Sequence, residues 1–167
     1  MGSKPKVLIV DDEPDVLLTL RILLEGEGFE PSLAAEGETA LRRIDHENPD
    51  LLLLDIMMPV LDGWMVLAQL ADRPQRPHVV VCSAKTGASD IARARELGAA
   101  AYITKPFDPA DLVATLRSVL AGETTAAPGT AGEAELPAPP VGADEHPADS
   151  GAPGAVPPVG NGVANDR

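Results

Sequence analysis

The sequence predicts an α/β fold built on a parallel sheet, and three observations lead to this prediction. Short apolar runs alternate with stretches of helical periodicity five times over the first 121 residues. Residues 51–54 are four consecutive leucines, which is typical of a strand covered on both faces. Charged side chains directly follow three of the apolar runs, at Asp11 and Asp12, at Asp55 and at Lys105. Strands joined by helices imply right-handed crossovers and a doubly wound parallel sheet.

The expected strands are apolar runs bounded by turn residues such as Asn48 and Pro49. In chain order they are residues 6–10, 29–34, 50–55, 78–82 and 100–104.

The expected helices lie between these strands and after the last one. Apolar side chains recur there with a period near 3.6, and Gly26 and Gly28 stop the first helix. The five stripes are Val16, Leu17, Leu20, Leu23 and Leu24; Ala40, Leu41 and Ile44; Trp64, Leu67, Ala68 and Ala71; Ile91, Ala94 and Leu97; and Leu112, Val113, Leu116, Val119 and Leu120. The fourth apolar stripe, formed by Ile91, Ala94 and Leu97, is the weakest.

Five such units fit the flavodoxin-like (βα)5 strand order 2-1-3-4-5. In this order the first, third, fourth and fifth strands are neighbours, so the charged residues that follow three of them converge at one edge of the sheet. Ligands bind at that edge in open α/β sheets.

The composition changes at Gly122. From there to Arg167 the chain consists mainly of Ala, Pro, Gly and acidic residues, with no aromatic residue and Leu136 as its only leucine. Such a segment cannot bury enough apolar surface to offset its chain entropy. We therefore expect one ordered domain at residues 4–121 and a disordered acidic tail at residues 122–167.

The overall composition restricts the partners of this chain. It contains 26 acidic and 13 basic residues, so the formal net charge is −13 and the pI is about 4.5. Without a basic stripe we expect no nucleic-acid binding. Cys82 is the only cysteine, which excludes an intramolecular disulfide. No apolar run approaches the ~20 residues that span a bilayer, so we expect a cytoplasmic protein without a membrane partner.

Three convergent carboxylates, those of Asp11, Asp12 and Asp55, repel one another unless a cation balances them. A donor set of oxygen atoms alone suits Mg²⁺, which binds proteins through one or two carboxylates together with waters and phosphate oxygens. Lys105 adds a positive charge that suits another phosphate oxygen.

Each of these residues also has a purely structural explanation. Asp11 and Asp12 could cap the helix that starts near Pro14, and Asp55 could cap a turn. Lys105 could be a solvated lysine before a helix. Capping accounts for one acid of the first pair better than for two.

Residues 4–121 resemble the receiver domain of bacterial two-component response regulators. The resemblance is specific because several short motifs occur in the family's order and spacing. They are Val10-Asp11-Asp12-Glu13, Leu53-Leu54-Asp55-Ile56-Met57-Met58-Pro59, Asp62-Gly63, Cys82-Ser83-Ala84 and Tyr102-Ile103-Thr104-Lys105-Pro106-Phe107.

The resemblance implies that Asp55 accepts a phosphoryl group from a phosphohistidine of a sensor histidine kinase or a phosphotransfer protein. It also implies that Asp12, Asp55 and the backbone carbonyl of Met57 ligate Mg²⁺ directly, while Asp11 acts through water.

The remaining implied roles concern the phosphate and the switch. Lys105 and the hydroxyl of Ser83 would contact the phosphoryl oxygens, and Tyr102 occupies the position of the switch aromatic. The peptide bond before Pro106 is expected to be cis. Tyr102 could otherwise be an exposed strand aromatic, and Ser83 a turn residue.

The resulting hypothesis is a single-domain response regulator that passes its signal to a partner protein through the fourth helix, fifth strand and fifth helix. Its only chemistry would be Mg²⁺-dependent self-phosphorylation and self-dephosphorylation. Two alternatives are a phosphatase of the haloacid dehalogenase type and a phosphorylation-independent adaptor. The phosphatase type carries Asp-x-Asp after its first strand, whereas Asp11 and Asp12 are adjacent. Packing roles are expected for Trp64, Met57, Met58 and Phe107.

Overall fold

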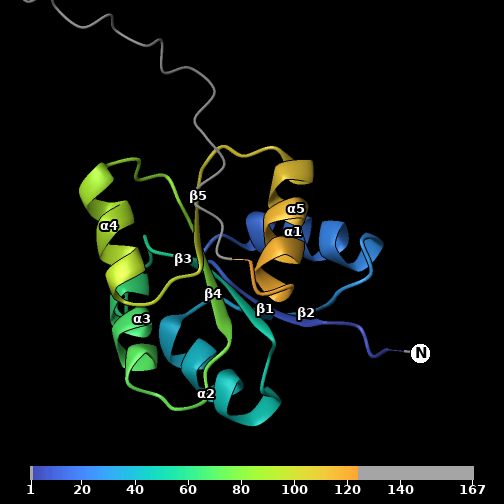
Figure 1. Cartoon of the computed structure of the whole chain (residues 1–167), viewed down its shortest axis with the longest axis horizontal. Coiled ribbons are helices and arrows are strands. Elements are labelled where there is room, and N and C mark those ends of the chain that lie inside the picture. Colours follow the sequence, from blue (N-terminus) through green and yellow to red (C-terminus); the bar gives the residue numbers. More distant parts are fainter. Residues whose placement is uncertain (1, 124–167) are drawn as a thin grey trace, which may run out of the picture. The chain divides into compact units, whose positions relative to one another are not determined.

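The computed structural model describes residues 2–123, in which five strands alternate with five helices (Figure 1). The strands are β1 (Lys6–Val10), β2 (Glu30–Ala34), β3 (Leu51–Asp55), β4 (His78–Ser83) and β5 (Ala101–Thr104). The helices are α1 (Pro14–Gly26), α2 (Gly37–Glu47), α3 (Gly63–Ala71), α4 (Ala88–Glu96) and α5 (Pro109–Leu120).

All strand pairs are parallel, and their order β2-β1-β3-β4-β5 confirms the prediction. The register places Val10 opposite Leu54, and Asp55 opposite Cys82. The carboxyl ends of β1, β3 and β4 therefore lie at the same edge, with that of β5 beyond them. This register brings the charged residues together.

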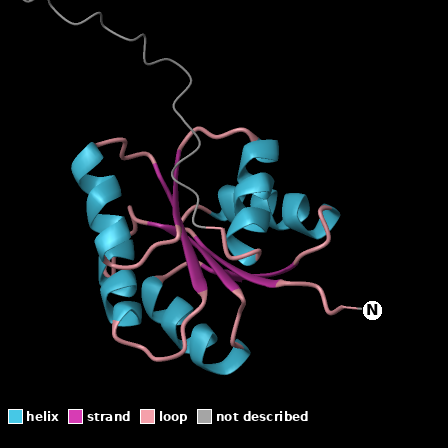
Figure 2. Cartoon of the chain, in the orientation of Figure 1, coloured by secondary structure: helices cyan, strands magenta, loops and turns pink. Residues whose placement is uncertain are grey.

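Helices cover both faces of the sheet (Figure 2). One apolar core lies under α2, α3 and α4, and the other lies under α1 and α5. The four leucines of β3 divide between them, with Leu52 and Leu54 in the first core and Leu51 and Leu53 in the second. This division explains why β3 has no polar side chain before its last residue, since a charge facing either core would lose its hydration.

Four strand boundaries differ by one residue from the sequence prediction, since β3 and β5 begin at Leu51 and Ala101 rather than at residues 50 and 100. The other two differences have reasons visible in the backbone hydrogen bonds. β2 begins one residue later than expected because the amide of Phe29 donates to the carbonyl of Leu24 and completes the end of α1. β4 continues one residue further because the carbonyl of Ser83 accepts from the amide of Lys105.

The tail predicted from Gly122 lies outside the described residues, apart from Gly122 and Glu123. Within residues 2–123, every helix is too short or too polar to cross a bilayer.

The loop between β3 and α3 folds back tightly on the end of β3. Gly63, the first residue of α3, lies against the carbonyl oxygen of Asp55, and a Cβ at this position would come within 2.6 Å of the Ile56 Cα. The amide of Gly63 donates to the carbonyl of Ile56 at 3.0 Å, and the Asp62 side chain caps α3 by accepting from the Met65 amide. Only glycine allows this approach, which fixes the position of Asp55.

Val60 in this loop has a left-handed backbone, with φ 67°. A β-branched residue is rare in this region because its Cβ crowds the backbone. The side chain is fully exposed, so it gains no packing in return.

We expect Val60→Gly to raise the free energy of unfolding by about 1 kcal/mol, because glycine removes the backbone strain and no buried contact is lost. Chemical denaturation measures this change. Gly28→Ala is the matched control, since Gly28 has φ 87° and open space around its Cα, and it should be destabilising. A loss of stability in Val60→Gly would contradict the assignment of strain.

Candidate functional site

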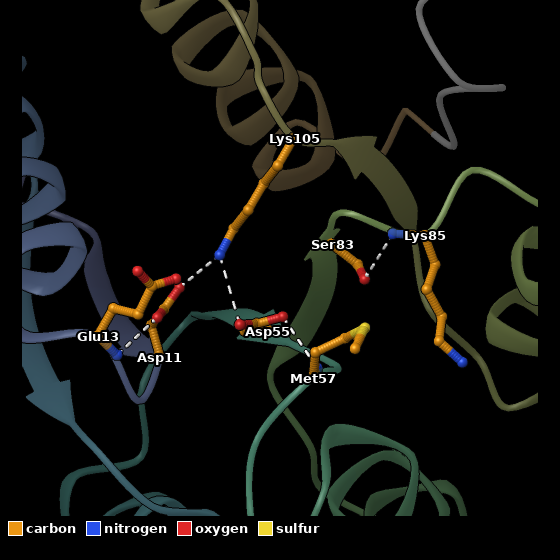
Figure 3. A network of polar contacts seen from close by, with 7 residues as sticks. All are labelled: Asp11, Glu13, Asp55, Met57, Ser83, Lys85 and Lys105. Atoms are coloured by element: carbon orange, nitrogen blue, oxygen red, sulfur yellow. Dashed lines mark hydrogen bonds and ion pairs between the residues drawn. The ribbon is translucent and has the colours of Figure 1, made fainter.

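Five polar side chains meet at the carboxyl edge of the sheet. Asp55 and Ser83 are the last residues of β3 and β4, Asp11 and Asp12 follow β1, and Lys105 follows β5. Each strand supplies its residue at the point where the sheet ends, so the parallel register alone assembles the cluster. Figure 3 shows Lys105 reaching from β5 towards Asp11 and Asp55.

The three carboxylates are close enough to share one cation. Asp11, Asp12 and Asp55 each offer an oxygen atom, and these oxygens lie within 4.8 Å of one another. Asp11 and Asp55 are buried, while Asp12 is more accessible to solvent. An oxygen-only donor set that is open on one side fits Mg²⁺, which retains several waters when it binds proteins.

Lys105 supplies part of the charge balance within the chain. Its ammonium nitrogen lies 2.7 Å from Asp11 Oδ2 and 3.4 Å from Asp55 Oδ2. Burial opposes the charge on Lys105, but the hydrogen bond to Asp11 and the charge of Asp55 outweigh it, so the pKa of Lys105 is raised. The lysine is therefore a bound component of the site rather than a solvated side chain. The peptide bond between Lys105 and Pro106 is cis.

Asp55 is the most constrained carboxylate of the cluster. Its Oδ1 accepts a 3.0 Å hydrogen bond from the Met57 amide, and its Oδ2 faces Lys105. Burial raises the pKa of Asp55, and the bond from Met57 and the charge of Lys105 offset this only in part, while Asp11 adds to the rise. The site thus holds a carboxylate whose ionised form needs more positive charge than the chain provides.

Helix capping does not account for the first acidic pair. The Asp11 side chain accepts from the amide of Glu13 at 2.9 Å, which shapes the turn before α1. The cap residue of α1 is Glu13 itself, and it makes no side-chain capping bond. The free oxygen of Asp11 points to Lys105 instead.

Ser83 and Tyr102 both contact the backbone of Lys85. Ser83 is fully buried, and its Oγ accepts from the Lys85 amide at 3.2 Å. The Tyr102 hydroxyl donates to the Lys85 carbonyl at 2.9 Å. Tyr102 is only 4% exposed, so the alternative of an exposed strand aromatic is wrong. Burial raises the pKa of the Tyr102 hydroxyl, which keeps it a donor.

A pocket of about 340 Å³ lies beside the acidic cluster, between the loops that follow β3 and β4. Its lining residues are Ile56, Met57, Met58, Asp62, Trp64 and Lys85. Trp64 and Met58 are buried and Phe107 packs against the core, as expected, but the prediction of a packing role for Met57 is wrong because its side chain is 55% exposed.

Sequence reasoning missed Lys85 and the close approach of Gly63. Lys85 takes part through its backbone amide and carbonyl, which any residue type supplies, so its side chain gives no signal. Gly63 did leave a signal, because glycine is a poor helix former and here begins a helix.

The response regulator receiver domain family matches residues 7–117. The chain is 38% identical over 125 residues to the alkaline phosphatase synthesis transcriptional regulatory protein PhoP of Bacillus subtilis. The aligned residues make up 75% of this chain and 52% of PhoP. It is 43% identical over 118 residues to the transcriptional regulatory protein PrrA of Mycobacterium leprae, covering 71% of this chain and 51% of PrrA. The chain thus spans about half the length of these curated relatives.

Among solved structures, the chain is similar to the BeF3-activated N-terminal receiver domain of Klebsiella pneumoniae RstA. The TM-score is 0.65 at 31% sequence identity, and the alignment covers 69% of this chain and 97% of that domain. The fold, the convergent edge of the sheet and the family match over residues 7–117 agree: this chain belongs to the response regulator receiver domain family of two-component systems.

Proposed function

We propose that this chain is a phosphorylation switch that receives a phosphoryl group on Asp55. The observation that carries the proposal is the setting of Asp55, a buried carboxylate at the carboxyl end of β3 that lies beside the Lys105 ammonium and the acidic pair of Asp11 and Asp12. A carboxylate is a competent phosphoryl acceptor, and the transfer needs positioning and charge neutralisation more than covalent machinery.

The proposed donor is a phosphohistidine of a sensor histidine kinase or of a phosphotransfer protein. A carboxylate oxygen of Asp55 forms a bond to phosphorus while the phosphorus–nitrogen bond of the donor breaks. The electron pair of that bond returns to the imidazole nitrogen of the donor. The 3.0 Å bond from the Met57 amide orients Oδ1, and Oδ2, which faces Lys105, is the oxygen that we propose reacts.

Asp12, Asp55 and the Met57 carbonyl are the residues that would hold Mg²⁺ directly, with Asp11 acting through water. A bound Mg²⁺ supplies positive charge that offsets the carboxylates and the phosphoryl oxygens. Lys105 supplies a second positive charge, since its ammonium already faces Asp55. These residues also support slow loss of the phosphoryl group to water, so the chain would carry out self-phosphorylation and self-dephosphorylation only.

The proposed output passes through Ser83 and Tyr102. A phosphoryl group on Asp55 brings strong acceptor oxygens next to the buried Ser83 hydroxyl. If Ser83 turns to donate to them, its bond with the Lys85 amide is lost, and the Lys85 carbonyl that holds Tyr102 shifts as well. The face built from α4, β5 and α5 would then change and bind a partner protein. The signal leaves by protein contact, because a net charge of −13 opposes direct binding of nucleic acid.

The proposed function is tested by labelling with acetyl phosphate. We expect one phosphoryl group per chain, on Asp55, and only when Mg²⁺ is present. Asp55→Asn should abolish the label while Asp62→Asn, on the same loop, should retain it. Equal labelling of Asp55→Asn would place the chemistry elsewhere. Multiple turnovers of an aryl phosphate would favour the phosphatase alternative.

A second expectation concerns the metal. Mg²⁺ at about 100 times its Kd should stabilise the folded chain by roughly 2.7 kcal/mol, since it binds the folded state alone. Thermal melting with and without Mg²⁺ measures this shift. Asp12→Ala should largely remove it, whereas Glu13→Ala, next along the chain, should preserve it. An undiminished shift in Asp12→Ala would exclude this carboxylate as a ligand.

Lys105→Met distinguishes the contribution of the Lys105 ammonium to stability from that of Mg²⁺. Without the ammonium, the buried carboxylates of Asp11 and Asp55 lose their partner, so metal-free stability should fall by roughly 1–3 kcal/mol. The gain on adding Mg²⁺ should then be larger than in the original chain. Lys85→Met is the control, because its ammonium is paired with Asp90. A Mg²⁺ response in Lys105→Met equal to that of the control would contradict this charge balance.

A further inference from the structure

Arg93 of α4 lies over the ring of Trp64 on α3. The guanidinium carbon is 4.4 Å from the ring centroid, within the range of a cation–π contact. Trp64 is 7% exposed whereas Arg93 is exposed, so the contact joins a buried indole to an arginine at the surface. The contact joins two helices that are adjacent on the same face of the sheet (Figure 1).

Few other contacts fix α4. Ala94 is its one buried residue, and Ile91 and the following Leu97 are only partly buried against the core. By contrast, α5 buries five residues. Because α4 has so little apolar anchorage, we expect the loss of a single contact such as that of Arg93 to loosen this helix measurably.

Both helices joined by this contact, α4 and α3, are also connected to the acidic site. At its first turn, α4 is tied to Lys85 through Asp90, with 3.8 Å between Lys85 Nζ and Asp90 Oδ1. The amide of Lys85 donates to Ser83, which lies beside Asp55 (Figure 3). On the α3 side, Trp64 lines the same pocket as the loop residue Met57 and as Lys85. A displacement of the loop after β4 is therefore expected to shift α4 relative to Trp64.

We propose that the Arg93–Trp64 contact is a latch that holds α4 against α3 in the unphosphorylated chain and so sets how readily phosphorylation repositions α4. This regulation rests on the proposed function of Asp55. The latch stabilises the resting arrangement only, because a shifted α4 carries Arg93 off the ring. Since α4 position and modification of Asp55 are thermodynamically linked, weakening the latch also favours the modified state of Asp55.

The latch itself is tested without any phosphoryl donor. In Arg93→Gln, amide exchange of residues 88–96 should be about twofold to tenfold faster, as expected for the loss of one cation–π contact. Arg95→Gln is the matched control, since it makes the same charge change on the same helix and should leave the exchange near that of the original chain. Arg93→Lys retains a cation and should fall between them. Equal exchange in Arg93→Gln and Arg95→Gln would overturn the proposal.

The coupling is tested with beryllofluoride and Mg²⁺, since beryllofluoride activated the RstA receiver domain. Trp64 is the only tryptophan, so its emission reports on the latch. The concentration that gives half-saturation should be about twofold to tenfold lower in Arg93→Gln than in Arg95→Gln. Equal values, with Asp55 still labelled by acetyl phosphate, would refute the coupling alone. No response in any variant, together with no label on Asp55, would refute the function on which it rests.

Discussion

The structure depends on the charge balance at one edge of a buried sheet. Asp11 and Asp55 lose most of their hydration there, and the Lys105 ammonium, at 2.7 and 3.4 Å, is the positive charge that the chain places between them. Counting Asp12, three carboxylates face one lysine. The remaining negative charge suits this edge to a divalent cation, and the phosphorylation of Asp55 that we propose depends on that cation.

The rest of the fold keeps these groups in place. The leucines of β3 fill both cores, so the strand that carries Asp55 has little freedom to shift. Gly63 lets α3 begin directly against the backbone of Asp55, and the strained turn at Val60 closes the intervening loop. The opposite side of the site is different, because α4 buries only Ala94 and has Arg93 over the ring of Trp64. In the account proposed here, the domain combines a firmly held Asp55 with a fourth helix that has little apolar anchorage.

The sequence predicted the strands, their order and the convergence of Asp11, Asp12, Asp55 and Lys105, because these follow from periodicity and parallel topology. Three features could not be predicted. Backbone contacts, such as those of Lys85, leave no trace in residue type. The pairing of Arg93 with Trp64 depends on how two helices pack, and neither residue stands in a recognisable motif. The side chain of Met57 belongs to an apolar motif, yet the loop turns it outward.

The most direct test of the charge-balance account is a carboxyl ¹³C NMR titration of Asp55 with and without Mg²⁺. In the metal-free chain, burial should hold the pKa of Asp55 above the ordinary range for aspartate, because Lys105 compensates it only in part. Added Mg²⁺ should lower that pKa markedly, since the cation favours the ionised carboxylate. An ordinary pKa that does not respond to Mg²⁺ would contradict the central claim that Lys105 alone supplies too little positive charge for the carboxylates at this edge of the sheet.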